Sequence, residues 1–354
     1  MKNKAYIKTV TAIDVFCGAG GLTEGLKQAG FKVVGAIEKE PLSADVYKLN
    51  HPEVHIWKED IKKITGKEIK RILQIKKGEL DLLAGCPPCQ GFSSMRTKNG
   101  AYRIEDKRND LVFDMLELVK DLMPKTVMIE NVPGLAYDPR MKKILSILKS
   151  LGYHIDDETV QIHDISKFMV PQRRKRMVLI TGFNKKIYFA QPEKTTKTVH
   201  QTLQNVPSPG TGNDPLHDYP VKRSERIEKL ISLIPKNGGS RSDLPKKYWL
   251  PCHLRYPKGF KDVYGRMKWE TVAPTITGGC ISPSKGRFLH PEENRAITLR
   301  EALLLQTFPK DYKFPLNIAR GSIALMIGNA IPPHYIKKYG EGIISSLRRR
   351  KTTF

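Results

Sequence analysis

The alternation of strand and helix patterns limits the fold of this chain more than any other feature of its sequence. Up to about residue 183, short β-type runs at 11–16, 32–37, 80–84, 126–130 and 177–181 alternate with amphipathic helical stretches. Two sets of apolar residues each share one helical face: Leu111, Val112, Met115, Leu118, Val119 and Leu122 in the first, and Met141, Ile144, Leu145, Leu148 and Leu151 in the second. This pattern predicts an α/β doubly wound domain, a mostly parallel sheet with helices on both faces and ligands at the carboxyl ends of its strands.

The next hundred residues have a different composition. Residues 184–290 hold 11 of the 24 prolines and 19 Lys and Arg against 8 Asp and Glu, with few long periodic segments. A second, smaller, loop-rich basic domain is therefore expected. Helical patterns resume at 298–306, around 322–327, and in an amphipathic stretch at 335–347.

The charge balance favours a polyanionic partner. The chain of 354 residues carries 61 Lys and Arg against 36 Asp and Glu, a formal charge of +25. Such an excess attracts nucleic acid through counterion release, although a solvated basic surface on an unrelated enzyme is the alternative. The first dozen residues lack a signal-peptide core and no apolar run approaches the roughly 18 residues of a membrane helix, so we expect a soluble, cytoplasmic protein without membrane contacts.

A glycine-rich segment follows the first predicted strand. In Asp14-Val-Phe-Cys-Gly-Ala-Gly-Gly the glycines permit a tight turn and a close approach to a ligand. Their spacing, with Gly25 next, is not the G-x-G-x-x-G of pyrophosphate binding, and Glu38 stands where an acidic side chain accepts ribose hydroxyls. An adenosine cofactor without a pyrophosphate fits these residues, and a plain tight turn is the alternative.

Two cysteines follow the predicted strand at 80–84, in Cys86-Pro-Pro-Cys89. This spacing occurs in redox pairs and in half of a zinc site, but zinc would need two further ligands, and only Cys17, Cys252 and Cys280 remain elsewhere in the sequence. We therefore expect no metal. The other interpretation makes one cysteine a nucleophile whose thiolate is favoured by nearby arginines and backbone amides.

Charged residues mark the two later strands. Glu130 ends the buried-type strand at 126–130, where a carboxylate is either paired structurally or ready for proton transfer beside the candidate thiolate. Arg174 and Arg176 lead into the strand at 177–181 and, as alternate residues, should project together. A basic surface loop is the alternative for these arginines.

Taken in order, these segments closely resemble the cytosine-5 DNA methyltransferase family. Six motifs carry the resemblance over nearly the whole chain: Asp14 to Gly21, Pro88-Cys89-Gln90, Glu130-Asn131-Val132, Gln172 to Arg176, Arg300-Glu301 with Leu305 to Pro309, and Gly328 to Pro333.

The resemblance implies a reaction that agrees with the residues. The thiolate of Cys89 would add to carbon 6 of cytosine, so that carbon 5 accepts the methyl group of S-adenosylmethionine. Glu130 would hold the N3 and amino edge and protonate N3, Arg176 would hold O2, and Arg174 would support the pocket of the nucleophile. The base must leave the duplex, and the stretch 93–110 is expected to close over it.

The resemblance also assigns binding residues and domains. Residues 1–185, completed by 322–354, would form the catalytic and cofactor-binding domain, 186–295 the target-recognition domain, and 296–321 the hinge and return segment. In the recognition domain, Arg and Lys would hold phosphates and read base edges. Cofactor contacts would come from Phe16, Gly18, Gly20, Gly21, Glu38, Asp60 and Asn329, and DNA contacts from Gln90, Ser93 and Thr275.

Other functions stay open on the sequence alone. An RNA cytosine-5 methyltransferase would use the same scaffold, and a catalytically silent DNA-binding relative would keep the charge without the reaction. A nicotinamide dehydrogenase is opposed by the glycine spacing. Because no large extension precedes the first strand, we expect a monomeric bacterial or archaeal restriction-modification enzyme, bound to the nucleoid and paired with a separately acting endonuclease.

Overall fold

The computed structural model describes residues 9–88, 110–219, 221–257, 259 and 261–349. By its internal contacts the chain divides into two units. The first, here called the sheet unit, combines Met1–Asp164, Lys175–Pro192 and Pro333–Phe354, and the second, the loop-rich unit, combines Ile165–Arg174 and Glu193–Pro332. The domain bounds expected for cofactor binding and target recognition stay a prediction.

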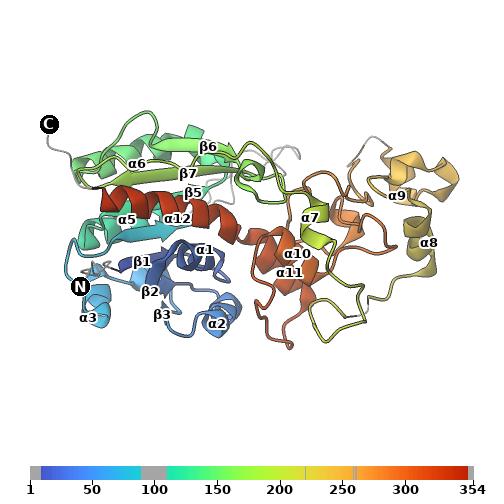
Figure 1. Ribbon diagram of the computed structural model, residues 1–354, viewed down its shortest axis with the longest axis horizontal. Helices are drawn as coiled ribbons and strands as arrows, with labels where there is room; N and C mark the ends of the chain where they lie inside the picture. The colour runs from blue at the N-terminus through green and yellow to red at the C-terminus, as the bar shows by residue number, and fades with distance from the viewer. Residues whose placement is uncertain (1–8, 89–109, 220, 258, 260, 350–354) are drawn as a thin grey trace, which may run out of the picture. The chain divides into compact units, whose positions relative to one another are not determined.

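Within the described residues, the sheet unit is built on one seven-stranded sheet (Figure 1). Neighbouring strands are parallel except β7, which runs antiparallel to both β5 and β6. The expected mostly parallel α/β fold is therefore confirmed. The order across the sheet is β3 (His55–Trp57), β2 (Phe31–Ile37), β1 (Val10–Val15), β4 (Leu82–Gly85), β5 (Thr126–Asn131), β7 (Lys175–Gly182) and β6 (Val160–Asp164).

Helices cover both faces of this sheet, because each strand alternates its side chains between them. On one face Ile13, Leu83 and Ile129 join a continuous apolar core with residues of three helices, α3 (Gly66–Leu73), α5 (Leu111–Leu122) and α6 (Pro139–Ser150). On the other face α1 (Gly21–Ala29) and α12 (Pro333–Arg348) pack against each other. Figure 1 shows these last two helices lying across the same side of the strands. The helix α2 (Pro41–Asn50) follows β2.

Local sequence explains where these helices begin and end. Asp138 caps α6 by accepting a hydrogen bond from the backbone N–H of Arg140, and Pro139 occupies the first helical position, where its missing N–H costs nothing. The helix α1 ends at Ala29 and is capped by Gly30, whose left-handed backbone (φ 101°) lets its N–H donate to the last carbonyl oxygens of the helix.

Short helices and irregular segments make up the loop-rich unit. One small core joins Leu230, Ile231, Ile234, Tyr264 and Leu289. Beside this core lies the fully buried guanidinium of Arg266, which donates to the carbonyl oxygens of Ile231, Ile234 and His290. These bonds satisfy buried backbone carbonyl oxygens that, in a sheet, would accept hydrogen bonds from a neighbouring strand. The helices of this unit are α7 (Val199–Leu203), α8 (Glu225–Leu233), α9 (Pro251–Arg255), α10 (Leu299–Leu305) and α11 (Arg320–Asn329).

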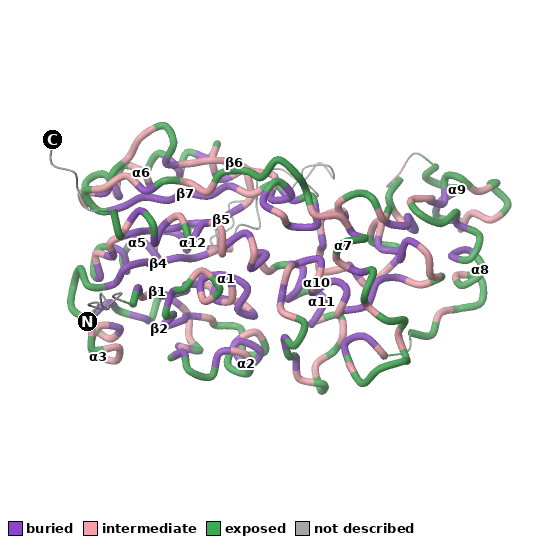
Figure 2. Tube along the Cα trace, viewed as in Figure 1, coloured by how far each residue is buried: buried purple, intermediate pink, exposed green. Residues whose placement is uncertain are grey.

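The sequence pattern did not predict two strands of the sheet. The strand β3 has only three residues, and β6 is half-buried throughout, so neither shows a buried apolar run (Figure 2). Both are edge strands, whose weaker burial leaves a weaker sequence signal. Among the helices in the described part of the chain, none is long and apolar enough to cross a membrane.

Candidate active site

Most of the charged and glycine residues singled out above lie at one edge of the sheet. The carboxyl ends of β3, β2, β1, β4 and β5 meet there, and β7, being antiparallel, begins there. The strand order reverses between β1 and β4, the position at which doubly wound sheets bind their ligands. Groups that follow β1, β2 and β3 therefore lie on one side of this reversal, and groups of β4, β5 and β7 on the other.

The glycine loop after β1 is strongly turned. Phe16, Gly18 and Gly20 have positive φ angles of 63°, 53° and 96°, so the chain reverses within five residues before α1 begins at Gly21. A side chain added at Gly18 would meet no atom within 4 Å, which means that the space above the loop is open. At Gly18, glycine adopts the positive φ angle without strain and leaves this space free.

Glu38, directly after β2, holds this loop. Its Oε2 accepts a hydrogen bond from the Gly18 N–H at 2.9 Å, and its Oε1 accepts one from the Glu40 N–H at 2.8 Å. Burial raises the pKa of the Glu38 carboxyl above its usual value. Because each carboxylate oxygen has two acceptor positions, Glu38 keeps capacity for the hydroxyls of a ligand.

Asp60 follows the next strand, β3, three residues after Trp57. Its Oδ1 accepts a hydrogen bond from the Lys62 N–H at 3.1 Å, and its Oδ2 lies 3.7 Å from Lys39 Nζ. Asp60 therefore stands at the same sheet edge as Glu38 and the glycine loop.

A buried polar network lies beneath the loop. Asp14 on β1 accepts hydrogen bonds from both the N–H and the hydroxyl of Thr23 on α1, at 3.0 and 2.7 Å. The Thr23 hydroxyl also bonds the Tyr47 hydroxyl of α2 at 2.9 Å. Burial is the main reason why the pKa of Asp14 rises to about 7, and these Thr23 bonds oppose the rise. The network ties the two ends of the glycine loop together, and the sequence analysis gave Tyr47 no role.

The segment after β4 is fixed to the end of β5. The side-chain amide of Asn131 donates to the carbonyl oxygen of Pro87 at 2.9 Å. Pro87 lies between Cys86 and Cys89, so this bond positions the chain just before the candidate nucleophile. Cys89 itself, with Gln90, Ser93 and residues 93–109 of the expected closing loop, lies outside the described residues.

Glu130 and Arg176 form a largely buried ion pair at this edge. Arg176 Nε lies 2.7 Å from Glu130 Oε1, and the side chains are 16% and 8% exposed. Although Arg176 Nε is close to this Oε1, within the described part of the chain no donor is aligned with the oxygen well enough to form a hydrogen bond. A buried carboxylate oxygen with unused acceptor capacity is well suited to hold a polar ligand group.

The described cysteines have unreactive surroundings in three of four cases. Burial raises the pKa of Cys17 well above its usual value, and that of Cys280 to about 12. The Cys86 thiol is desolvated and lies near the Glu130 charge, and both effects raise its pKa. Cys252 is exposed in the loop-rich unit. A thiol with a raised pKa supplies little thiolate, so Cys17, Cys86 and Cys280 are poor nucleophiles.

The remaining predicted residues lie in the loop-rich unit. Arg174 is buried there and donates to the carbonyl oxygens of Ile276 and Gly328, both at 2.9 Å. The Thr275 hydroxyl donates to the carbonyl oxygen of Arg173 at 2.6 Å. Asn329 ends α11 with an exposed side chain.

The buried amide of Gln172 is a structural tie that the motif alone did not reveal. Its Nε2 donates to Gln306 Oε1 at 2.6 Å, and its Oε1 accepts from the Ile276 N–H at 3.1 Å. Two of the family-like motifs are thus joined by a hydrogen bond between buried side chains within one unit.

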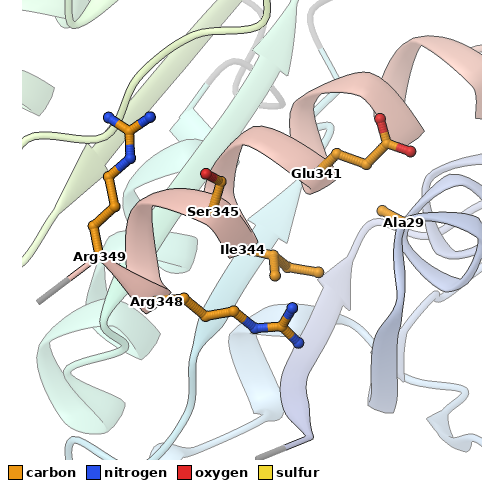
Figure 3. A pocket seen from close by; sticks show the side chains of 6 residues that line it. All are labelled: Ala29, Glu341, Ile344, Ser345, Arg348 and Arg349. Atoms are coloured by element: carbon orange, nitrogen blue, oxygen red, sulfur yellow. The ribbon is translucent and has the colours of Figure 1, made fainter. Parts of the chain in front are cut away.

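A separate hollow of about 530 Å³ lies at the other end of α1 (Figure 3). Ala29, Ile344, Ser345 and Arg348 are among its lining residues. Ala29 ends α1, whereas the glycine loop precedes its first residue, so a helix of nine residues separates this hollow from the candidate site. Where the structure describes the chain, no group of three or more His, Cys, Asp or Glu side chains is arranged to hold a metal ion.

Comparison with known proteins identifies the family. The family model of C-5 cytosine-specific DNA methylases matches residues 10–345. The Type II methylase M.HgiDII of Herpetosiphon aurantiacus is 32% identical over 96% of this chain and 98% of its own length. The Type II methyltransferase M1.HphI of Haemophilus parahaemolyticus is 31% identical over 96% of this chain and 88% of its own length.

Solved structures agree on the fold. One is an Escherichia coli protein encoded within a prophage and described as a candidate DNA modification methyltransferase. It superposes with a TM-score of 0.70 at 24% identity, covering 96% of this chain and all of the other. The Dnmt2 methyltransferase of S. pombe superposes with a TM-score of 0.63 at 18% identity, covering 97% of this chain and all of the other. The family model and the two Type II relatives extend this likeness from fold to family, and the chain belongs to the C-5 cytosine-specific DNA methylases.

Proposed function

We propose that this DNA (cytosine-5-)-methyltransferase uses S-adenosylmethionine and a covalent Cys89 intermediate to methylate a cytosine flipped out of duplex DNA. The observation that carries the proposal is the buried Glu130–Arg176 ion pair, whose Glu130 Oε1 accepts no hydrogen bond from the described residues. The pair stands beside the segment that leads to Cys89, which the Asn131–Pro87 hydrogen bond fixes. A carboxylate and a guanidinium side by side match the donors and acceptors along the pyrimidine edge.

The ion pair supplies the electrostatic part of the reaction. Glu130 holds the N3 and amino edge of the base and, once it has taken up a proton, delivers that proton to N3, while Arg176 holds O2 as negative charge develops. The low exposure of both side chains excludes water, which strengthens these interactions. Arg174, through its two carbonyl partners, braces the segment that precedes Arg176 and supports the pocket of the nucleophile from there.

The covalent step makes an unreactive carbon nucleophilic. The Cys89 thiolate forms a bond to carbon 6, the ring electrons move toward N3, and the resulting enamine attacks through carbon 5. After the methyl group arrives, a base removes the proton on carbon 5, the double bond re-forms, and Cys89 leaves as a thiolate. Of the five cysteines, Cys17, Cys86 and Cys280 are disfavoured for this step by their raised pKa values.

The residues after β1, β2 and β3 fit an adenosine-type methyl donor. The open space above Gly18 leaves room for the ligand, and Phe16, Gly20 and Gly21 shape its border. Glu38 has acceptor capacity for ribose hydroxyls, Asp60 lies at the next strand end toward the adenine, and Asn329 completes the contacts from α11. When bound, S-adenosylmethionine supplies a sulfonium-activated methyl group.

Duplex DNA is the proposed substrate, in a restriction-modification system with a separately acting endonuclease. The chain's charge of +25 supports a polyanionic partner, and both Type II relatives named above are methyltransferases of that kind. Gln90 and Ser93 contact the DNA in this proposal. Thr275 reaches the phosphate of the target nucleotide by exchanging its hydrogen bond with the Arg173 carbonyl for one with the phosphate.

Transfer of a labelled methyl group tests the proposal. The purified protein, duplex DNA and S-adenosylmethionine labelled in its methyl group are incubated, and the product is sequenced after bisulfite treatment. We expect label in DNA and modified cytosines in one short recurring context. Label on adenine, or label only in RNA supplied in parallel, would contradict the proposal, and an RNA-only result would favour an RNA cytosine-5 methyltransferase.

A further inference from the structure

Two tyrosines of α12 are buried on the face of the sheet that carries the ion pair. Tyr335 and Tyr339 are 0% and 1% exposed, their ring centroids are 4.8 Å apart, and the Tyr335 hydroxyl donates to the Tyr339 hydroxyl at 3.4 Å. Their spacing of four residues places them on one face of the helix. Fully buried hydroxyls are costly unless they serve as hydrogen-bonding groups.

The alternation along β5 and β7 directs Glu130 and Arg176 toward this helix. Ile129 belongs to the apolar core on the opposite face, so its neighbour Glu130 points to the face that α1 and α12 cover. In the register of β7, Met177 belongs to that same opposite core, and Arg176 therefore shares the face of Glu130. The ion pair and the two tyrosines lie on one side of the sheet.

Ring contacts extend from the tyrosines to the strand beside Arg176. The Tyr339 ring lies 6.2 Å from the ring of His163, and His163 pairs directly with Arg176 in the β6–β7 ladder. Burial raises the pKa of Tyr335 well above its usual value, Glu130 adds to the increase, and Arg176 opposes it. Tyr335 therefore remains a neutral phenol on the side of the sheet that carries the ion pair.

The position of α12 is itself fixed by the helix that follows the glycine loop. A side chain added at Gly25 on α1 would overlap the carbonyl oxygen of Pro333 and lie 2.5 Å from Ile336 Cβ. The first turn of α12 is thus in close backbone contact with α1, two residues before Tyr335. This contact leaves little freedom for the Tyr335 side chain relative to the sheet.

We propose that Tyr335, braced by Tyr339, is a positioning residue that holds the Glu130–Arg176 ion pair in the geometry required to grip the cytosine. The inference has a structural part, that Tyr335 keeps the ion pair in place, and a catalytic part, that this position speeds methyl transfer. Only the catalytic part rests on the proposed function. Tyr335 touches no substrate in this account. It acts by limiting the movement of the two charged side chains. It does so from the face of the sheet opposite to α3, α5 and α6.

The structural part is tested by the exchange of the Arg176 Nε–H proton with solvent, measured by NMR on protein labelled with nitrogen-15 arginine. An Arg176→Lys variant assigns the signal. Burial and ion pairing slow such exchange, and we expect Tyr335→Phe to accelerate it about five-fold or more. Tyr153→Phe is the matched control, because the Tyr153 hydroxyl is also buried and donates to the Pro124 carbonyl oxygen at 2.7 Å. Equal exchange in Tyr335→Phe and Tyr153→Phe would overturn the proposal.

The catalytic part is tested by kinetics on the same proteins. Tyr335→Phe should lower kcat about ten-fold, because a less firmly held Glu130–Arg176 pair stabilises the transition state less well, while KM for DNA and the cofactor dissociation constant stay within about two-fold. Tyr153→Phe should keep the wild-type kcat. A purely structural role would instead lower the melting temperature of Tyr335→Phe and leave its kcat per folded molecule unchanged, which would contradict the proposal.

The outcomes separate this inference from the proposed function. If the wild type transfers no methyl group to duplex DNA but Tyr335→Phe accelerates Arg176 exchange, the proposed function fails and the positioning role stands. If the wild type methylates DNA and Tyr335→Phe changes neither exchange nor kcat, the positioning role fails and the proposed function stands. Should Tyr335→Phe not fold, Tyr339→Phe removes the acceptor of its hydrogen bond and is expected to shift both measurements in the same direction.

Discussion

At the scale of single residues, burial assigns different chemistry to side chains of the same type. Asp14 on β1 and Glu130 on β5 belong to one sheet, with β4 between their strands, yet Asp14 bonds Thr23 beneath the glycine loop whereas Glu130 pairs with Arg176. Asp14 Oδ1, like Glu130 Oε1, accepts no hydrogen bond within the described residues, but no opposite charge lies against Asp14. Asp14 is therefore a pH-sensitive support of the loop rather than a partner of the base.

Asp14 gives the folded protein a predictable pH dependence. Folding raises its pKa from 3.8 to about 7, so between these values the folded protein holds a proton that the unfolded chain has released. The contribution of this group to stability is therefore present in full below about pH 4 and is lost as the pH rises to about 7. Relative to Asp14→Asn, the wild type should lose about 2–3 kcal/mol of unfolding free energy between pH 5 and pH 8.

Urea unfolding at the two pH values measures this difference. Because all other titrating groups are shared by the two proteins, they cancel in the comparison to first order. A difference between wild type and Asp14→Asn that stays constant from pH 5 to pH 8 would show that Asp14 does not titrate in this range.

The residues of the candidate site differ in how well the sequence predicts them. The pattern placed Glu130 at the end of a buried strand and Arg176 at the start of another, and both lie at the expected sheet edge. It did not single out Tyr335, because an aromatic residue in an amphipathic helix is most often part of the core. The spacing of Tyr335 and Tyr339 was the available signal, but only the antiparallel β7 shows which charges the pair faces.

At the scale of elements, the close contact between α1 and α12 links the glycine loop to the ion pair. Gly25 permits the contact, because any larger side chain would overlap the first turn of α12. Gly340, later on α12, likewise lies against Ala29 at the end of α1. The two helices are thus closely packed at both ends of their contact.

Gly25→Ala should therefore destabilise the protein. Its added methyl group would collide with the Pro333 carbonyl oxygen and Ile336, and overpacking of this kind costs about 1–3 kcal/mol. Gly321→Ala is the control, because Gly321 lies in α11 with no atom near the position of an added side chain, and there the substitution should stabilise by about 0.5–1 kcal/mol. Thermal unfolding of both variants measures the two effects. An unchanged melting temperature for Gly25→Ala would contradict the close contact.

Element prediction from sequence succeeded where burial is strong. Five strands and the helices near 111–122, 141–151, 298–306, 322–327 and 335–347 correspond to observed elements. The edge strands β3 and β6 were missed, and the antiparallel direction of β7 could not be inferred, because periodicity reports burial and carries no information on strand direction.

At the scale of the whole molecule, the sheet unit is assembled from three separate segments of the chain. Its last helix, α12, follows the entire loop-rich unit in sequence, yet it covers the face on which the ion pair lies. The proposed site therefore combines residues more than 200 positions apart, Glu130 and Tyr335 among them. Composition revealed the basic, proline-rich segment but could not reveal this return, since a local pattern does not specify which distant segments pack together.

The central claim, transient bonding of Cys89 to the cytosine ring, is tested most directly by trapping that bond. Wild type, Cys86→Ser and Cys89→Ser are incubated with S-adenosylmethionine and duplex DNA in which 5-fluorocytosine replaces cytosine. The fluorine on carbon 5 cannot leave as the proton does, so an enzyme that has added to carbon 6 stays attached. We predict a covalent adduct with wild type and Cys86→Ser, mapping to the peptide that contains residue 89, and none with Cys89→Ser. An adduct with Cys89→Ser, or one that maps to another peptide, would contradict the account.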